Sequence, residues 1–509
     1  MRQGPLAGRY GVVAAMVMLA LIPYLALSAA LDPLAPIITG QLHMSAQTMS
    51  LGSGLGNAAY AVGTVLAVQF AQHLPQRRMM LAYAVMLVIG SVLAAAATDP
   101  TMYIVGHMLQ GLATSMLLIA AVPPLVIGFP GKLRTTIMIM NLCIFGAVAL
   151  GPFIGGVQAE AHAWRPLFWI VAGVSGLALI LALLTFEDAP PANLDSPRDL
   201  PAIGLAAVGC VAAFLGASEL TTHGFGDVEV LPPLLGGLAL IVALIVYQFR
   251  STRPLLTIRN LLTSSIPVAG VAVALFAAAA SVSVTVLTAS VLAEHYGPVH
   301  VGLLYLPELG GAVIAAVALG VVLNKRAMHY LPLAGMLFLA GGIVVFRFAM
   351  PAGQPLTIVG SALTGLGLGA TVAPALFVAG FSLPAASLQR VFAIVELLRA
   401  VAAFMIAPIF VHFASTVSGD FEHGTEITLW IGLALALGGA AIGIVIYALS
   451  GARPQTPDLD GFLAGRGSAW PSPPLLAKLR RPQPAVTPIS VAEQRVPESV
   501  AVSVAESVD

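Results

Sequence analysis

The chain has 509 residues, of which 59% are hydrophobic and only 9% are charged, and its mean hydropathy is +0.96. This composition excludes an ordinary soluble globular protein of this length. The formal net charge is zero and no basic domain is present, so nothing indicates nucleic-acid binding. The two cysteines, Cys143 and Cys210, lie inside apolar segments, and their number and spacing predict neither a disulfide framework nor a metal site.

Fourteen apolar segments are each long enough to cross a bilayer as a helix. The first is too long for the core of a usual signal peptide, so we interpret it as an uncleaved span. Short connections rich in proline and glycine separate most of the segments. The expected spans are about 11–31, 49–72, 80–97, 102–127, 137–158, 167–186, 201–220, 231–249, 266–291, 301–323, 331–349, 357–380, 391–414 and 427–449.

The positions of the cations favour this count. If the N-terminus is cytoplasmic, 19 of the 22 Lys and Arg residues fall on the cytoplasmic side, as the positive-inside rule requires. The three exceptions are Arg165 in an outer loop, and Arg347 and Arg399 within spans. We therefore expect an all-α, multi-pass protein of the cell (cytoplasmic or inner) membrane, with both termini in the cytoplasm.

The fifth span carries a stripe of small residues. On a helix, Ala147, Gly151, Gly155 and Ala159 lie four residues apart on one face, where a second helix can approach closely. Pro152 removes one backbone hydrogen bond and is expected to bend the helix beside this stripe. Taken alone, the stripe indicates only a tightly packed membrane helix.

The longer string around this stripe resembles a known family motif. Gly146, Gly151, Pro152, Gly155 and Gly156 form the pattern Gly-x4-Gly-Pro-x2-Gly-Gly, and Trp-Arg-Pro-Leu-Phe follows from residue 164. This pattern resembles the fifth-helix antiporter motif of the fourteen-helix drug:proton antiporters in the major facilitator superfamily. The order of spans resembles that family over nearly all of residues 10–450, although only a few short strings match closely.

The resemblance implies a domain organisation. Residues 1–186 would form an N-terminal six-helix half, 187–259 two extra central helices with their linkers, and 260–450 a C-terminal six-helix half. Residues 451–509 are polar and rich in proline, and we expect them to be a disordered cytoplasmic tail without a core of its own.

Two motifs depart from the family pattern. Gly106-His107-Met-Leu-Gln110-Gly111 resembles Gly-Arg-x-x-Gln-Gly, with His107 in place of the arginine that the family links to proton coupling. The motif between spans two and three lacks its aspartate and retains the basic pair Arg77-Arg78. His107 can change its charge near neutral pH, as arginine cannot, but it is equally well explained as a neutral histidine bonded to a neighbouring helix.

Ionisable residues inside the membrane are costly and are therefore candidate functional residues. Asp32 and Glu308 are candidates for proton coupling, with His107 as an accessory. Asp32 is also explained as the interfacial end of the first span, and Glu308 by a structural role beside Pro307. Glu396 and Arg399 lie three residues apart in one span and can form a charged pair, which would make both tolerable in hydrocarbon.

The expected function is secondary active transport, because no enzyme or nucleotide-binding signature is present. We expect proton-coupled efflux of small amphipathic organic compounds by alternating access, with protons, the substrate and the lipid bilayer as partners and with no cofactor, metal or nucleic acid. An adaptor protein is neither indicated nor excluded by the sequence. The alternatives are an uncoupled facilitator or specific metabolite exporter and, from another class, a non-transporting membrane sensor on the same fold.

Overall fold

The computed structural model describes residues 5–185, 191 and 197–478. Within this part of the chain, fourteen helices are long and apolar enough to cross a membrane, which confirms the predicted all-α, fourteen-span fold. The elements are α1 Tyr10–Leu42, α2 Ala46–His73, α3 Gln76–Ala95, α4 Pro100–Gly128, η1 Pro130–Lys132, α5 Leu133–Asn141, η2 Leu142–Gly146, α6 Ala147–Glu160, α7 Arg165–Thr185, α8 Leu200–Ser218, η3 Glu219–Thr221, α9 Leu231–Arg250, α10 Ile258–Thr263, α11 Ser265–His295, α12 Pro298–Tyr305, α13 Pro307–Val322, η4 Arg326–His329, α14 Leu331–Ala349, α15 Gln354–Phe381, η5 Ala385–Ser387, α16 Leu388–Val417, α17 Phe421–Ser450 and α18 Leu459–Leu463.

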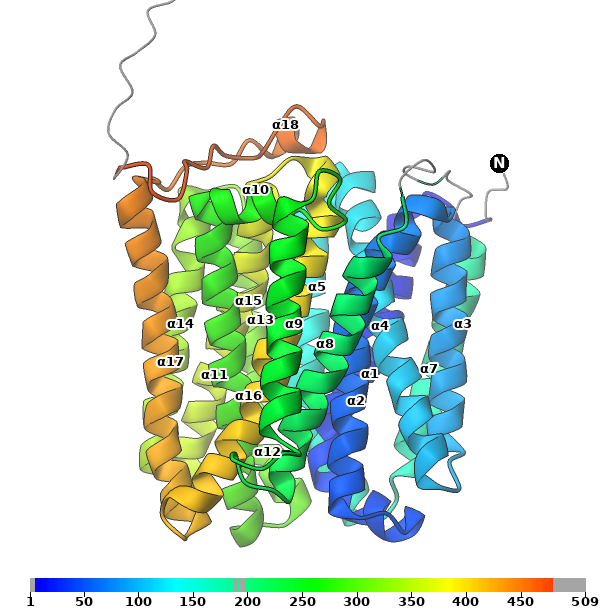
Figure 1. Cartoon of the computed structure of the whole chain (residues 1–509), viewed down its shortest axis with the longest axis vertical. Helices are drawn as coiled ribbons and strands as arrows, with labels where there is room; N and C mark the ends of the chain where they lie inside the picture. The colour runs from blue at the N-terminus through cyan, green and yellow to red at the C-terminus, as the bar shows by residue number, and fades with distance from the viewer. Residues whose placement is uncertain (1–4, 186–190, 192–196, 479–509) are drawn as a thin grey trace, which may run out of the picture.

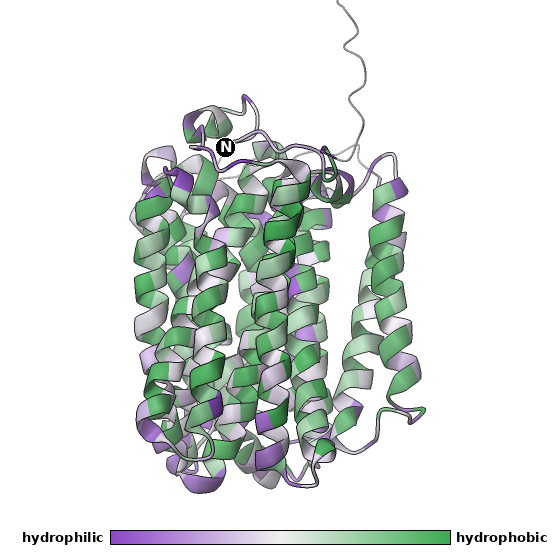
Figure 2. Cartoon of the chain, turned by 90° about the vertical axis from the view of Figure 1, so that its left-hand side faces the viewer, coloured by the Kyte–Doolittle hydropathy of each residue, from purple (hydrophilic) through white to green (hydrophobic). Residues whose placement is uncertain are grey.

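The long helices run side by side along the molecule, and hydrophilic residues gather at its two ends (Figure 2). Several helices begin at a side-chain cap at one of these ends. Asp99 accepts a hydrogen bond from the backbone N–H of Met102 at the start of α4, and Asp420 accepts one from His423 at the start of α17. Such caps satisfy backbone donors that the first helical turn leaves free.

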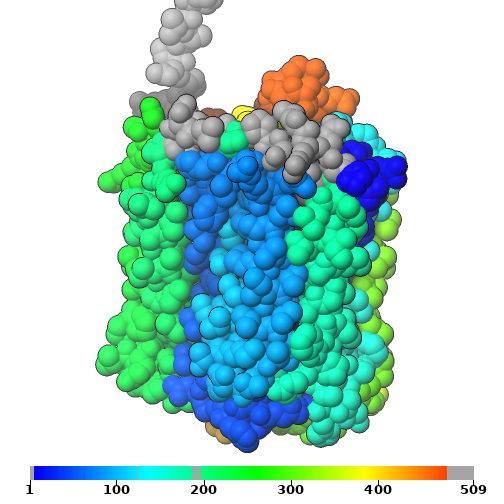
Figure 3. All heavy atoms as spheres, turned by 90° about the vertical axis from the view of Figure 1, so that its right-hand side faces the viewer, coloured from blue at the N-terminus to red at the C-terminus, as the bar shows by residue number. Residues whose placement is uncertain are grey.

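The helices pack in two groups. The N-terminal group comprises α1 to α7, and the C-terminal group comprises α11 to α17 (Figure 1). The groups meet where α2 and α4 pack on α16, where α6 packs on α12, and where α5 packs on α13. Figure 3 shows part of the N-terminal group on one face, with the hairpin of α8 and α9 in green at its edge.

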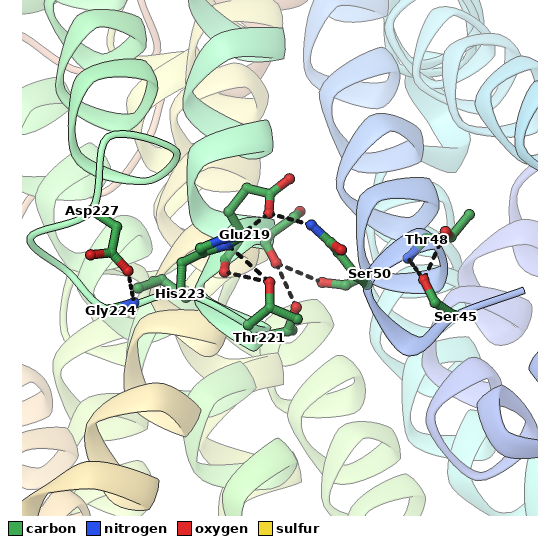
Figure 4. Close-up of polar contacts among 12 residues, drawn as sticks. Ser45, Thr48, Ser50, Glu219, Thr221, His223, Gly224 and Asp227 are labelled. Atoms are coloured by element: carbon green, nitrogen blue, oxygen red, sulfur yellow. Dashed lines mark hydrogen bonds and ion pairs between the residues drawn. The ribbon is translucent and has the colours of Figure 1, made fainter.

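The hairpin of α8 and α9 covers the seam between α2 and α16, since α8 packs on both. Only 28% of the most apolar window of α9 is buried, the lowest share among the candidate spans of the described chain. Near the loop of this hairpin, Gln47 at the start of α2 donates a hydrogen bond to Glu219 Oε2 at 2.7 Å (Figure 4). On the other side of the seam, His412 Nδ1 of α16 lies 2.9 Å from the carbonyl oxygen of Leu220. The loop therefore contacts both helical groups.

The first span differs from its expected bounds. It was expected to end at Leu31, but α1 continues to Leu42 with Pro33 and Pro36 inside the helix. Asp32 is thus not at a helix end. It lies ten residues before the end of α1, which corresponds to about 15 Å along the axis. The prolines are accommodated because α6 and α7 pack on α1 and Pro33 itself contacts the face of α6 that carries Gly155.

Two other spans are internally irregular. The fifth is built from η1, α5, the π-helical η2 at Leu142–Gly146 and α6, which contains Pro152. The tenth is interrupted at Leu306, between α12 and α13. Irregular turns inside membrane helices are tolerated where neighbouring helices surround them.

Residues 451–478, which were expected to be part of a disordered tail, pack against the rest of the protein. Residues 479–509 of the expected tail lie outside the described residues. The expected domain boundary between residues 186 and 187 lies outside them as well. The described tail lies across the end of the molecule from which α1 starts (Figure 1). Trp470 and Phe462 are buried, and Trp470 Nε1 donates to Ser382 Oγ at 2.5 Å. The tail has no core of its own; it is held because these two aromatic side chains are buried against the ends of helices in the C-terminal group.

Candidate functional site

The small-residue face of α6 is covered by α1. A side chain at Gly155 would meet the backbone of Ala30, with its Cβ 2.5 Å from the carbonyl oxygen, and one at Gly151 would meet Ala29. A side chain at Gly156 would instead meet the backbone of Pro298 in α12 of the C-terminal group. A Cβ at Gly146 would lie 3.3 Å from Cδ1 of the Leu309 side chain in α13. The motif glycines therefore serve two interfaces, one within the N-terminal group and one between the groups.

The Trp164-Arg165 pair that follows this helix forms a small hydrogen-bonded clamp. Trp164 Nε1 and Arg165 Nη1 both donate to Oε1 of Gln41, near the end of α1, at 2.9 and 3.0 Å. Arg165 Nη2 donates to the carbonyl oxygen of Ala97 at 2.7 Å, and its guanidinium lies 4.4 Å from the centroid of the Trp164 ring. These contacts fix the α6–α7 connection against α1 and the α3–α4 loop.

His107 is buried in a row of aromatic rings rather than paired with a carboxylate. Its ring stacks with Tyr103 at a centroid distance of 6.1 Å and lies 5.6 Å from Tyr24. Gly56 of α2 lies against the His107 ring, where a Cβ would be 2.5 Å from Cδ2. Among the described residues, His107 Nδ1 has no hydrogen-bond partner. The space left by Gly56 thus admits the imidazole in place of the motif arginine.

The row of rings continues to the other helical group. Tyr24 stacks with Tyr60 of α2 at 6.3 Å, and the Tyr60 hydroxyl donates to Glu396 Oε2 of α16 at 3.4 Å. Glu396 in turn accepts from Nε and Nη2 of Arg399 at 2.9 and 2.7 Å. The Glu396–Arg399 pair is buried, and Tyr60 ties it to the N-terminal group.

The two other acidic candidates have different surroundings. Asp32 is exposed on α1, on the same face as Pro36 and Gly40, which lie four and eight residues further along the helix. Glu308 is only 5% exposed, at the start of α13 just after the break at Leu306. Within the described chain, the Glu308 carboxylate has no hydrogen-bond or salt-bridge partner. The structure brings His107 and the Glu396–Arg399 pair into one row but leaves Asp32 and Glu308 outside it.

A small cavity lies between the helical groups. Its walls come from α4, the α5–η2 segment, α15 and α16, so each group contributes two. Its volume is about 30 Å³, close to that of one water and far below the roughly 300–1,000 Å³ of a site filled by a small organic ligand. Except for Asn141 and Glu396, its lining is apolar. In this conformation the space between the helical groups is too small for such a ligand.

Sequence reasoning missed Asn141, Tyr60 and Tyr24. Asn141 Nδ2 donates to the carbonyl oxygen of Gly369 in α15 at 3.0 Å, across the interface between the groups. All three are polar groups inside apolar spans, so the cost of burying polar atoms in a membrane was the available signal.

No group of three His, Cys, Asp or Glu side chains in the described part of the chain could hold a metal ion. Cys143 and Cys210 are both buried as free cysteines.

The sequence is similar to known transporters. A family model described as Major Facilitator Superfamily matches residues 17–325. The multidrug resistance protein B homolog of Mycobacterium tuberculosis is 26% identical over 306 residues, which cover 58% of this chain and 56% of that protein. The uncharacterized MFS-type transporter YubD of Bacillus subtilis is 26% identical over 431 residues, 82% of each chain.

A third relative is named for a specific compound. The tetracenomycin C resistance and export protein of Streptomyces glaucescens is 26% identical over 270 residues, which cover 52% of this chain and 50% of that protein. The match therefore spans about half the length of this relative and of the Mycobacterium protein.

Two solved structures share the fold. A crystal structure of the peptide transporter POT has a TM-score of 0.59 at 17% identity, and a POT family transporter in complex with a thioalcohol-conjugated peptide has 0.61 at 14%. Each match covers 87% of this chain and 96% of the other. At these identities the likeness concerns the fold alone.

Proposed function

The chain belongs to the Major Facilitator Superfamily, and we propose that it exports small amphipathic organic compounds by alternating access, driven by inward movement of protons. It is a multi-pass membrane transporter and not an enzyme. The substrate class is proposed because relatives are named for multidrug resistance and for tetracenomycin C export, and because the interior surface is mainly apolar.

The observation that carries this proposal is the small, mainly apolar cavity between two helical groups. Two helices of each group line it, and Asn141, which is part of its lining, donates a hydrogen bond to Gly369 of the other group. A movement of one group against the other would open the cavity and expose Asn141, Glu396 and their apolar neighbours. Alternating access requires such a movement, and a ligand drives it by binding one arrangement better than the other.

We assign proton coupling to Asp32 and Glu308, with His107 as an accessory. Glu308 is buried at a helix break without a recorded partner, and Asp32 is exposed on a helix that packs on α2, α4, α6 and α7. A carboxylate in such a place can bind and release a proton as its surroundings change. Its amide analogue cannot.

We propose that the end of the molecule carrying the described tail faces the cytoplasm of a cell with a cytoplasmic or inner membrane. The start of α1 and residues 451–478 lie at this end (Figure 1). Before residue 391, thirteen basic residues fall in the N-terminal tail or in the connections between spans expected at this end. The positive-inside rule directs such residues to the cytoplasm.

One observation favours an uncoupled facilitator as the second candidate. The position that carries a permanently charged arginine in the motif holds His107, buried among aromatic rings. A neutral imidazole there would leave the N-terminal group without the cation that the coupled family uses. The facilitator would move the same compounds, but only down their own gradient.

Two experiments test the function. A growth screen with and without the gene, across many toxic compounds, identifies a substrate by the resistance that the gene confers. Flux of that compound is then measured in proteoliposomes that contain the purified protein. Failure to transport any compound to which the gene confers resistance would favour the non-transporting sensor.

A further inference from the structure

The lining of the cavity between the helical groups includes two polar side chains. These are Asn141, from the end of α5, and Glu396, from α16. The rest of the wall is formed by aliphatic and aromatic side chains, including Leu118, Met140 and Phe377.

Asn141 presents an uncommitted acceptor. Its side chain is 1% exposed, and its Nδ2 is used by the hydrogen bond to Gly369. Its Oδ1 is buried and has no hydrogen-bond partner among the described residues. A buried amide oxygen without a partner costs free energy, which a ligand that donates a hydrogen bond would recover.

Glu396 is held in place by one of its two oxygens. The hydrogen bonds recorded for its carboxylate, two from Arg399 and one from Tyr60, all fall on Oε2. The charge of Glu396 is balanced by Arg399 in the same helix. The two polar side chains of the lining therefore offer acceptor oxygens without excess negative charge.

We propose that Asn141 and Glu396 form a subsite that binds the hydrogen-bond-donating end of an amphipathic substrate, such as a primary ammonium or hydroxyl group. This inference rests on the proposed function and specifies which compounds it selects. The donor end binds at Asn141 Oδ1 and Glu396, and the apolar body contacts the surrounding hydrocarbon wall. Selection depends on N–H or O–H donors rather than on net charge, because Arg399 already balances Glu396.

The test uses two fluorescent probes of equal charge, 2-(1-naphthyl)ethylammonium and its N,N,N-trimethyl analogue. Only the first has N–H donors. Binding to the purified full-length protein in detergent is measured for wild type, Asn141→Leu and Asn141→Asp. Wild type is expected to prefer the primary ammonium by at least about 10-fold, which is the lower end of what a hydrogen bond to a charged group contributes.

The two Asn141 variants distinguish the loss of the acceptor oxygen from the loss of the hydrogen bond between the helical groups. Both variants lose the Nδ2 donor to Gly369. Asn141→Asp keeps an acceptor oxygen, so it should retain the preference for the primary ammonium. Asn141→Leu has no acceptor and should reduce that preference below about 3-fold. As a matched control for the cavity wall, Phe377→Leu should weaken both probes alike. Size-exclusion profiles and melting temperatures show whether each variant is folded.

Three results would overturn the inference: wild type binds neither probe, wild type binds both equally, or folded Asn141→Leu keeps the full preference. Flux of the primary ammonium in proteoliposomes keeps the two proposals distinguishable. If wild type transports it and Asn141→Leu retains the preference, only the subsite is wrong. If wild type binds the probes selectively but transports neither them nor any compound from the growth screen, the transport function is wrong.

Discussion

Asn141 and Gly369 join the two helical groups by a single hydrogen bond of 3.0 Å from a side-chain amide to a backbone carbonyl. Because the bond joins α5 to α15, the groups cannot part there without breaking it. A net contribution of about 1 kcal/mol is typical of such a bond. That value is small beside the differential binding that a ligand can supply, so the contact is suited to an interface that opens repeatedly.

Gly155 tests the close packing of α1 on α6. In Gly155→Leu, the new side chain meets the backbone of Ala30 and would force the helices apart. Overpacking of this kind costs about 1–3 kcal/mol, enough to disturb two balanced conformations. We expect flux to fall at least about 10-fold while the protein remains in the membrane. Gly173→Leu is the matched control, since Gly173 has open space around it. Normal flux in Gly155→Leu would contradict the assignment of this contact.

Topology is tested by single cysteines in the α8–α9 loop and after α9. Positions 227 and 253 lie at opposite ends of the inserted hairpin, and the native Cys143 and Cys210 are buried. With both termini cytoplasmic, an impermeant thiol reagent added to whole cells should label Asp227→Cys and leave Arg253→Cys unlabelled. Permeabilised cells provide the control, in which both should react. The reverse pattern in intact cells would invert the proposed orientation.

Removing one charge of the buried Glu396–Arg399 pair on α16 is expected to destabilise the protein more than removing both charges. Arg399→Ala removes both recorded donors of the pair and leaves Glu396 as a buried charge, at a cost of about 3–5 kcal/mol. Replacing both Glu396 and Arg399 by methionine removes both charges and should recover most of that loss. Thermal unfolding in detergent measures the difference. Equal melting temperatures for wild type and Arg399→Ala would show that the pair does not stabilise the fold.

The docked tail predicts a dependence on pH through His329. Its ring centroid lies 4.8 Å from that of Trp470, its Nδ1 lies 2.9 Å from the Tyr447 hydroxyl, and burial lowers the pKa of His329 from its ordinary value of 6.5 to about 4. Above pH 6.5 the histidine is neutral whether the tail is docked or released, and docking is at full strength. As pH falls from 6.5 toward 4, the released state binds a proton that the docked state does not, so docking weakens.

At pH 5 the loss amounts to about 2 kcal/mol at most. Limited proteolysis of the tail should therefore be faster at pH 5 than at pH 7 in wild type. In His329→Gln the rate of cleavage should depend little on pH. A wild-type rate that does not change with pH, once the protease's own pH dependence is corrected with an unfolded substrate, would contradict this role of His329.

The fold was predictable from the sequence because apolar length is decisive in a membrane. Each helix must satisfy its own backbone hydrogen bonds over about 20 residues, so the fourteen spans follow from hydropathy alone. Their ends were less predictable. Asp32 and Pro33 suggested the end of a span, but a proline inside a membrane helix can be accommodated by packing, and α1 continues to Leu42.

The site was predictable only in part. Charged residues such as Glu308 and Glu396 stand out in apolar segments, but their neighbours come from distant parts of the chain. The contact of Tyr60 with Glu396 joins residues 336 apart, and no local pattern predicts it. The docked tail was missed for a related reason: its composition indicated disorder, while Phe462 and Trp470 are buried only because the ends of other helices provide the surface.

Proton coupling is tested first by substituting its two acidic candidates, Glu308 and Asp32. Glu308→Gln keeps the shape of the side chain but cannot carry a proton, so it should abolish accumulation driven by a pH gradient while downhill flux of substrate persists. Asp32→Asn should show the same pattern if it shares the proton. If both amide variants remain coupled, the proton moves elsewhere, and His107 is the next residue to substitute.

The central claim is that this transporter exports its substrate in exchange for protons, and substrate flux in proteoliposomes under an imposed pH gradient tests it most directly. The measurement compares wild-type flux with a gradient, without one, and with the gradient collapsed by an ionophore. The account predicts accumulation against the substrate gradient only while the proton gradient is present. Flux that is the same under all three conditions would contradict proton coupling and identify the protein as a facilitator.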